Sequence, residues 1–248
     1  LRTPAQAYKD AMLWLERLEQ GKIYEIVRKK ISIPLSDEIK PNVRKKFGDL
    51  SQMNYRINHE SSEKTNDRFI KNPKEWEHYH AVYREDRKNW QITPYEEAIK
   101  WLKERPHMVI GDFGCGEALL AATVENIVYS FDHVAINETV TACDMCHTSL
   151  DDECLDAAVF SLSLMGSNFV DYLREAHRCL KLDGYLWIAE PTSRIKNIQL
   201  FQDLLFKLGF DISHIGEKWK FTFIRAIKIE RKSNLKALEY IKSLDVLG

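Results

Sequence analysis

Short apolar runs, each ending close to a polar residue, recur through the second half of the chain. They have the length and the β-branched or aromatic content expected of buried strands. Runs of this kind, without apolar and polar alternation, are typical of a parallel sheet covered on both faces. The pattern therefore predicts an α/β fold. The runs cover residues 109–113, 127–131, 140–143, 155–162 and 185–190.

The segments between and after these runs follow helical spacing or carry turn residues. Asn168 is placed to cap one helix, Gly209 is placed to end another, and residues 181–184 are expected to form a turn. Two final strands with no helix between them make a closing hairpin. The sequence therefore predicts a Rossmann-like, mostly parallel seven-stranded sheet whose last strand is antiparallel. The expected helices are 168–180 and 195–208, and the closing strands are 210–215 and 219–229.

Helices are also expected at both ends of the chain. Thr3 and Pro4 open a helix to about Glu19, a second helix covers 24–31, and Pro34 and Pro41 mark a linker. A helix over 76–90 is expected to lie over the sheet as a lid. Leu235, Leu238, Ile241 and Leu244 follow a helical period. The predicted parts are a helical extension (1–52), a lid and substrate region (53–106), a core (107–230) and a closing helix (231–248).

Acidic residues follow three successive predicted strands. Asp112 precedes the turn Gly114-Cys115-Gly116, Asp132 ends the second run, and Asp144 follows the third. The carboxyl ends of parallel strands meet at one edge of the sheet, where nucleotide-like ligands bind. Asp132 is placed to accept the hydroxyls of a ribose, and Asp144 with Met145 to bind an adenine. The pattern predicts a nucleoside site.

The cofactor that best fits this site is S-adenosylmethionine (SAM). A nicotinamide dinucleotide needs its pyrophosphate on a third glycine, whereas Leu119 stands there and Glu117 lies where phosphate approaches. SAM carries no phosphate, and its ammonium and sulfonium groups tolerate carboxylates such as Asp112 and Glu117. The closing hairpin is also characteristic of SAM-dependent methyltransferases. The glycine turn is expected to hold the cofactor through Gly114 and Gly116.

Several motifs within residues 53–229 occur together in one known family. They are Tyr55-Arg56-Ile57-Asn58, Tyr79-His80, Asp112 to Gly116, Phe131-Asp132, Cys143-Asp144-Met145, Val159 to Asn168 and Ala189 to Arg194. With them the chain resembles the nucleomethylin or ribosomal RNA-processing protein 8 family. Its members are SAM-dependent enzymes that methylate N1 of an adenine in large-subunit ribosomal RNA. Departures are His59-Glu60-Ser61-Ser62 and Ser161, where a cysteine is common.

The resemblance implies which residues form the sites. Those implied at the cofactor are His80, Gly114, Asp132, Asp144, Met145 and Ser161. Those expected at the substrate are Arg56, Met165, Gly166, Asn168 and Arg194. Aromatic and basic residues of the lid are expected either to pack over the sheet or to hold an unstacked base. They are Trp76, Tyr79, Tyr83, Arg84, Arg87, Lys88 and Trp90.

The segment after the fourth run bears on the acceptor atom. Enzymes that methylate an exocyclic amine tend to place an Asp/Asn-Pro-Pro-aromatic motif there, whereas this chain has Ser161 to Gly166. The ring N1 of adenine has a free lone pair and needs mainly positioning. Glu190 and His80 are candidates for later removal of a proton. The alternatives are methylation of another RNA or of a protein side chain, or a non-catalytic SAM-binding module in a larger assembly.

Charge and composition limit the class of partner. Residues 1–107 carry net positive charge and residues 108–248 net negative charge, with basic clusters at 28–30 and 44–46, which suits RNA. The sequence has no apolar run long enough to span a bilayer and no signal peptide, so no membrane partner is expected. We expect an intracellular protein, nuclear or nucleolar in a eukaryote and cytoplasmic in a bacterium. No metal site is expected, and a missing initiator Met suggests an upstream domain.

Overall fold

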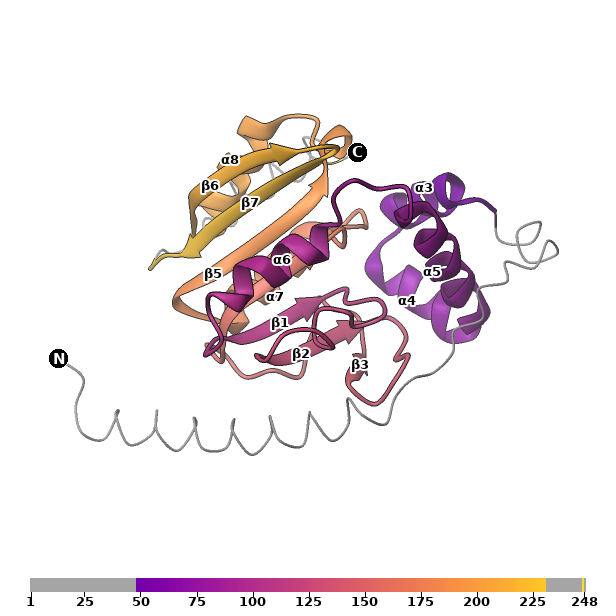
Figure 1. Cartoon of the computed structure of the whole chain (residues 1–248), viewed down its shortest axis with the longest axis horizontal. Helices are drawn as coiled ribbons and strands as arrows, with labels where there is room; N and C mark the ends of the chain where they lie inside the picture. Colours follow the sequence, from indigo (N-terminus) through magenta and orange to yellow (C-terminus); the bar gives the residue numbers. More distant parts are fainter. Residues whose placement is uncertain (1–47, 231–246, 248) are drawn as a thin grey trace.

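A seven-stranded sheet forms the centre of the computed structural model, which describes residues 48–230 and 247 (Figure 1). The strand order is β3-β2-β1-β4-β5-β7-β6. The strands β3, β2, β1, β4 and β5 run parallel to one another, whereas β7 is antiparallel to both β5 and β6. The predicted mostly parallel sheet with an antiparallel last strand is confirmed. The strands are β1 (Val109–Phe113), β2 (Ile127–Asp132), β3 (Val140–Ala142), β4 (Leu155–Ser161), β5 (Leu180–Pro191), β6 (Phe210–Lys218) and β7 (Phe221–Lys228).

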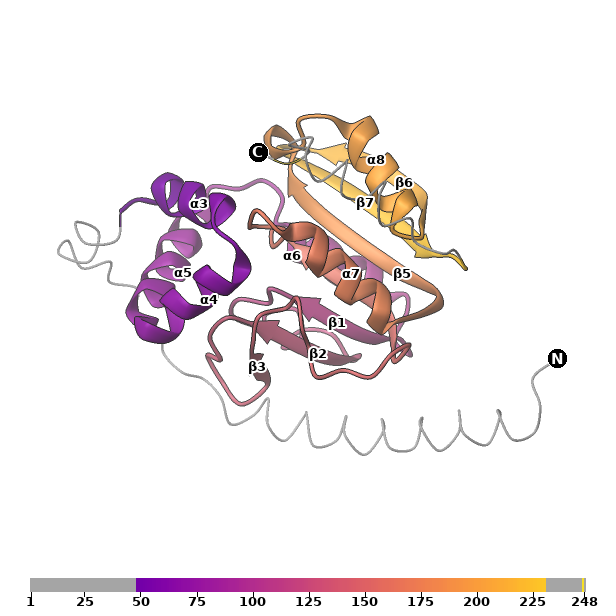
Figure 2. The ribbon, with the colours of Figure 1, turned by 180° about the vertical axis from the view of Figure 1, so that it is seen from behind.

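Helices cover both faces of the sheet, which is why its central strands lack polar alternation. One helix packs on the face that carries Ile110 and Val159, and two helices pack on the face that carries Phe160 and Ile188 (Figures 1 and 2). All four side chains are fully buried, so the two cores share the sheet between them. The helices are α6 (Pro94–Lys103) on the first face, and α7 (Phe169–Cys179) and α8 (Ile198–Lys207) on the second.

Three further helices form a layer over the carboxyl ends of β1 and β2, and we call this layer the lid (Figure 1). Their starts are well specified. Asp49 and Gln52 form a reciprocal capping box, the Ser61 hydroxyl accepts from a backbone N–H, and Pro73 opens the third helix. The lid has its own small apolar cluster of Ile57, Phe69 and Trp76. The helices are α3 (Leu50–His59), α4 (Ser62–Lys71) and α5 (Pro73–Arg87).

In a Rossmann-like fold a helix follows the glycine turn, but the segment after β1 in this chain does not form one. Residues 117–123 form hydrogen-bonded turns, with no α-helix. Gly116 and Ala118 both have φ of 55°, in the left-handed region. Two left-handed residues so close together interrupt the regular i→i−4 hydrogen bonds that an α-helix requires.

Several predicted boundaries also need correction. The lid helix expected over 76–90 spans 73–87, because Pro73 suits the first helical turn. The helix expected from Ile195 begins at Ile198, where the Asn197 side chain caps it, and a short 3-10 helix, η1 (Thr192–Arg194), precedes it. Residues 181–184 belong to β5 as an irregular part of the strand. Gly209, with φ of 92°, ends α8 as predicted.

Some predictions lie outside the described residues. These are the helices over 3–19 and 24–31, the linker around Pro34 and Pro41, the basic clusters at 28–30 and 44–46, and the closing helix. The division of the chain at residues 52, 106 and 230 stays a prediction. Within the described ranges, no helix is long and apolar enough to cross a membrane.

Candidate functional site

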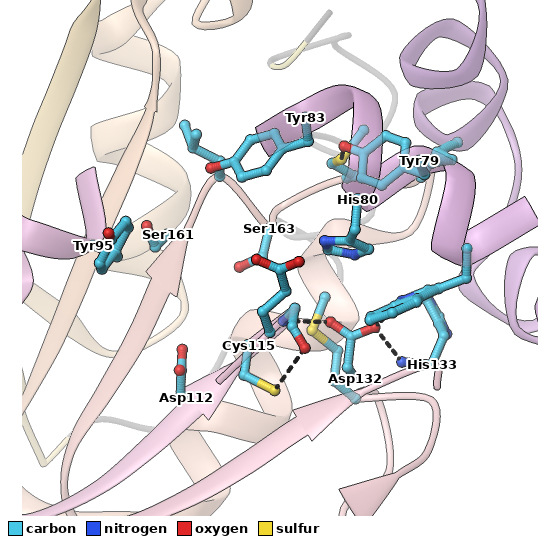
Figure 3. A pocket seen from close by; sticks show the side chains of 18 of the residues that line it. Tyr79, His80, Tyr83, Tyr95, Asp112, Cys115, Asp132, His133, Ser161 and Ser163 are labelled. Atoms are coloured by element: carbon cyan, nitrogen blue, oxygen red, sulfur yellow. Dashed lines mark hydrogen bonds between the residues drawn. The ribbon is translucent and has the colours of Figure 1, made fainter. Parts of the chain in front are cut away.

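A cavity of about 130 Å³ lies where the ends of β1, β2 and β4 meet helix α5, and we call it the first cavity. Figure 3 shows Tyr79, His80 and Tyr83 of α5 on one side of it, with Asp112 and Asp132 on the strand ends. Most residues predicted to contact the cofactor line this cavity, although their roles stay predictions. They are His80, Asp112, Gly114, Gly116, Asp132, Met145 and Ser161.

The Asp132 carboxylate at the end of β2 is the most heavily hydrogen-bonded group of the first cavity. Its Oδ1 accepts from the indole N–H of Trp76 at 2.8 Å and from the backbone N–H of His133 at 2.8 Å. Its Oδ2 accepts from the backbone N–H of Gly116 at 2.8 Å. These three donors fix the carboxylate and use much of its acceptor capacity. Room for an additional donor, such as a ribose hydroxyl, remains on Oδ2.

Asp112 is buried near the end of β1, where the ionised form of its carboxyl group is unfavourable. Loss of hydration, together with the nearby charge of Asp132, raises the pKa of Asp112 to about 7. A bound cation would stabilise both carboxylates and lower this pKa. The cavity is therefore better suited to a cationic ligand than to an anionic one.

The glycine turn brings backbone close to the cavity. Gly114 and Gly116 have φ of 76° and 55°, which side chains rarely permit. A Cβ on Gly114 would lie 2.4 Å from Cβ of Ser163, and one on Gly116 would lie 2.8 Å from Cε1 of His80. Both contacts are shorter than real Cβ atoms tolerate. Glycine at these two positions therefore keeps the turn and the cavity in shape.

Arg84 of α5 neutralises Glu117, whose charge the sequence offered as a reason to exclude a pyrophosphate. The two side chains form a largely buried ion pair, so Glu117 brings little net charge to the cavity. The exclusion of a pyrophosphate therefore depends on Asp112 and Asp132. Among the described residues, the buried hydroxyl of Thr65 has no partner and also lines the cavity. Two carboxylates and a free hydroxyl fit the charged and polar groups of SAM.

His80 lies on α5 between the lid and the glycine turn. Its ring stacks at a tilt on Trp76, with 4.0 Å between ring centroids, and contacts the position of Gly116. Burial lowers the pKa of His80 below its ordinary value of 6.5, despite the opposing charge of Asp132. The imidazole is therefore neutral near pH 7 and can donate one hydrogen bond and accept another.

A second cavity, of about 470 Å³, adjoins the first. Tyr79, Tyr83, Leu162 and Met165 line both, so these side chains form the boundary between them. The second cavity lies between α3, α5 and the β6–β7 turn. Three of the residues predicted for catalysis or substrate binding line it. They are Met165, Glu190 and Arg194.

Glu190 and Arg194 hold the segment that separates the two cavities. Glu190 Oε1 accepts from the backbone N–H of Leu164 at 2.8 Å, and its Oε2 accepts from Arg194 at 2.7 Å. Arg194 also donates to the carbonyl oxygen of Leu164 at 3.0 Å. Burial raises the pKa of Glu190, while Arg194 opposes this rise. Both carboxylate oxygens are thus engaged in positioning Leu164.

Asp144 and Asn168, predicted at the cofactor and the substrate, do not line either cavity. Asp144 accepts from the hydroxyl of Ser62 at 2.6 Å and from the backbone N–H of Cys146 at 3.1 Å. Asn168 accepts from the Ser62 backbone N–H at 2.8 Å and donates to the Ser62 hydroxyl at 2.9 Å. Asn168 occupies the N-cap position of α7 without capping it. Both side chains instead fasten the lid at Ser62.

Gly166 and Arg56, predicted at the substrate, also lie outside both cavities. Gly166 has φ of 117°, and a Cβ there would lie 2.6 Å from the hydroxyl of Tyr172. Its neighbour Ser167 donates from its backbone N–H to the carbonyl oxygen of Glu60 at 2.9 Å. Arg56 forms an ion pair with buried Glu75 at 2.9 Å. The structure places these residues in the attachment of the lid.

Two features of the first cavity were missed by sequence reasoning. The bond between Trp76 and Asp132 joins residues from the lid and the sheet, and helical spacing alone favours Trp76 as packing. Thr65 follows no motif that marks it as part of a site. Only the fold brings these side chains to the strand ends.

The fold is the one that SAM-dependent methyltransferases share. A TehB-like SAM-dependent methyltransferase from Corynebacterium glutamicum aligns with a TM-score of 0.50 and 20% identity, covering 63% of this chain and 100% of that one. Residues 37–245 match a family profile described as a hypothetical methyltransferase.

Relatives identify the family more closely. Ribosomal RNA-processing protein 8 of Drosophila melanogaster is 32% identical over 246 residues, covering 95% of this chain and 69% of the relative. The Schizosaccharomyces pombe 25S rRNA (adenine(645)-N(1))-methyltransferase is 41% identical over 169 residues, covering 62% and 53%. The chain therefore belongs to the ribosomal RNA-processing protein 8 family, which confirms the resemblance seen in its motifs. It spans 32% of the length of the rat relative.

Proposed function

We propose that this protein binds SAM in the first cavity and transfers its methyl group to N1 of an adenine in large-subunit ribosomal RNA. The observation that carries the proposal is the shared boundary of the two cavities. A methyl donor in the first cavity would face an acceptor in the second across Tyr79, Tyr83, Leu162 and Met165. The name of the S. pombe relative supports adenine N1 as the acceptor.

Different residues of the first cavity would bind different parts of the cofactor. When bound, SAM supplies an electrophilic methyl group on a positively charged sulfur. Asp132 would accept a hydrogen bond from a ribose hydroxyl, Asp112 would attract the cationic end, and Met145 would pack on the adenine ring. The glycine turn allows backbone to approach, and His80 closes the site from the lid. These residues would together hold the cofactor beside the boundary with the second cavity.

The second cavity provides positioning for the acceptor. Adenine N1 carries a lone pair at neutral pH, so a correctly held base needs little activation. Glu190 and Arg194 fix the backbone of Leu164, which lies between the boundary residues Leu162 and Met165, and so hold the boundary between the cavities. A sealed pocket beside residues 163–168 would favour a non-catalytic module. A cavity of about 470 Å³ at this place instead favours turnover.

The target base must leave its stack or come from a single strand to enter the second cavity. Ribosomal RNA as partner implies, in a eukaryotic cell, that the protein acts in the nucleolus. Both the RNA partner and this location are parts of the proposal.

The test is transfer of radiolabelled methyl groups from SAM to large-subunit ribosomal RNA prepared from cells that lack the enzyme. Nucleoside analysis is expected to place the label in N1-methyladenine. Asp132→Ala is expected to abolish the signal, whereas Asp211→Ala, at an exposed position of β6, serves as the matched control. Label in another nucleoside would overturn the acceptor, and no label in any RNA would overturn the activity.

A further inference from the structure

The second cavity has an aromatic wall of a size suited to a nucleic-acid base. Tyr83 and Trp90 meet edge to face with 5.5 Å between ring centroids, and Trp90 lies 5.1 Å from Phe221. Tyr79 and Tyr83 are nearly parallel, with 12° between their planes. Bases held outside a helix stack on such rings. The volume of about 470 Å³ lies within the range of small-ligand sites, roughly 300–1,000 Å³.

Asn58, in the last turn of α3, brings an unused acceptor to this cavity. Among the residues that the structure describes, its buried Oδ1 has no hydrogen-bond donor within reach. One turn earlier, Asn54 accepts from the hydroxyl of Tyr79 at 3.0 Å, so the neighbouring amide is already committed. A buried acceptor left unpaired is costly. A ligand that donates a hydrogen bond to Asn58 would remove this cost.

The chemistry of the bases indicates which donor fits. Adenine carries an exocyclic amine directly beside ring N1, so a group that holds this amine also places N1. Met165, at the boundary with the first cavity, lines the same space as Asn58. Guanine and hypoxanthine present an oxygen at that position, which would face Oδ1 unfavourably. Cytosine also has the amine, but a purine covers more of the aromatic wall.

Lys220 brings one exposed positive charge to the rim of the second cavity, which also carries the exposed carboxylate of Asp86. Lys220 is exposed there beside Trp219, and its ammonium group lies 4.7 Å from the centroid of that ring. A nucleotide whose base lies on the aromatic wall would bring its phosphate towards this rim. The attraction between an exposed lysine and a phosphate is modest but has the correct sign.

We propose that Asn58 is the specificity-determining residue of an adenine-nucleotide subsite in the second cavity, where its side-chain oxygen accepts a hydrogen bond from the exocyclic amine. The link from this subsite to methyl transfer rests on the proposed function. Binding of the nucleotide itself does not require turnover, so the subsite can be tested separately.

The experiment measures dissociation constants by ligand-observed NMR, with S-adenosylhomocysteine present to fill the first cavity. The probes are adenosine, purine riboside and inosine 5′-monophosphates, which carry an amine, a hydrogen and an oxygen at the same ring position. We expect the wild type to bind adenosine monophosphate about tenfold more tightly than the purine riboside, and inosine monophosphate least tightly.

The variants assign this preference to Asn58. In Asn58→Ala the preference for the amine is expected to disappear, whereas Asn58→Asp keeps an acceptor and is expected to keep it. Asn72→Ala is the matched control, because Asn72 lies in the lid but lines neither cavity. Equal binding of the first two probes by the wild type, or an unchanged preference in Asn58→Ala, would overturn the proposal.

Failure of this proposal is distinguishable from failure of the proposed function. Loss of methyl transfer to RNA with an Asn58-dependent preference intact would overturn only the methyltransferase activity. Methyl transfer to adenine without the preference would overturn only the role of Asn58. If Asn58→Ala does not fold, the wild type and Asn58→Asp decide, since both must discriminate the amine from hydrogen.

Discussion

Replacing Asp112 by asparagine tests the electrostatics of the first cavity directly. The substitution keeps the size of the side chain and removes its titration. In the wild type, burial and the neighbouring Asp132 raise the pKa of Asp112 from 3.8 to about 7. The folded protein therefore holds this proton more tightly than the unfolded chain does. Asp112 favours folding at low pH, and this contribution is lost as the pH rises from about 4 to 7.

The magnitude follows from the two pKa values. Integrated between pH 5 and pH 8, the loss amounts to about 3 kcal/mol of unfolding free energy. The asparagine side chain of the variant contributes no such dependence, since its amide does not titrate. His80 and the other titrating groups are present in both proteins, so they largely cancel in the difference.

The assay is urea denaturation of wild type and Asp112→Asn at pH 5, 6, 7 and 8, without cofactor. We expect the unfolding free energy of the wild type, relative to the variant, to fall by about 3 kcal/mol over this range, with most of the fall between pH 5 and 7. A difference that stays constant within about 0.5 kcal/mol would refute the account of Asp112, because about 1.4 kcal/mol accompanies each tenfold proton affinity change.

Three further substitutions test other contacts of the site. Asp132→Ala is expected to abolish SAM binding by calorimetry, and an unchanged affinity would show that the nucleoside is wrongly placed. Trp76→Phe removes the indole N–H from the Asp132 carboxylate and is expected to lower the unfolding free energy by about 1.5–3 kcal/mol in urea, with Trp101→Phe as the control. Glu190→Gln breaks the ion pair with Arg194 and is expected to slow methyl transfer at least about tenfold with unchanged SAM affinity. A parallel loss of SAM affinity would contradict the assignment of Glu190 to the second cavity.

The sheet could be predicted because its signals are local. Each buried strand is a continuous apolar run, and Gly209 ends α8 where its left-handed conformation is required. The departures have equally specific causes. The left-handed conformation of Ala118 prevents a regular helix after β1. Alanine rarely adopts this conformation, so the residue type does not predict it.

Part of the site could also be predicted from the sequence, and part could not. Asp112 and Asp132 lie at strand ends, and the order of parallel strands was enough to bring them together. The partner of Asp144 was not predictable, since Ser62 lies far away in sequence and reaches it only through the folded lid. The unpaired oxygen of Asn58 is likewise visible only when the cavity around it is known.

Helix α5 serves both cavities at once, because Tyr79 and Tyr83 face each of them. A ligand in one cavity packs on side chains that also shape the other cavity, so binding at the two cavities is coupled. By thermodynamic linkage, the change in affinity is the same in either order. Under the proposed function, this coupling would link departure of the methylated RNA to departure of the spent cofactor.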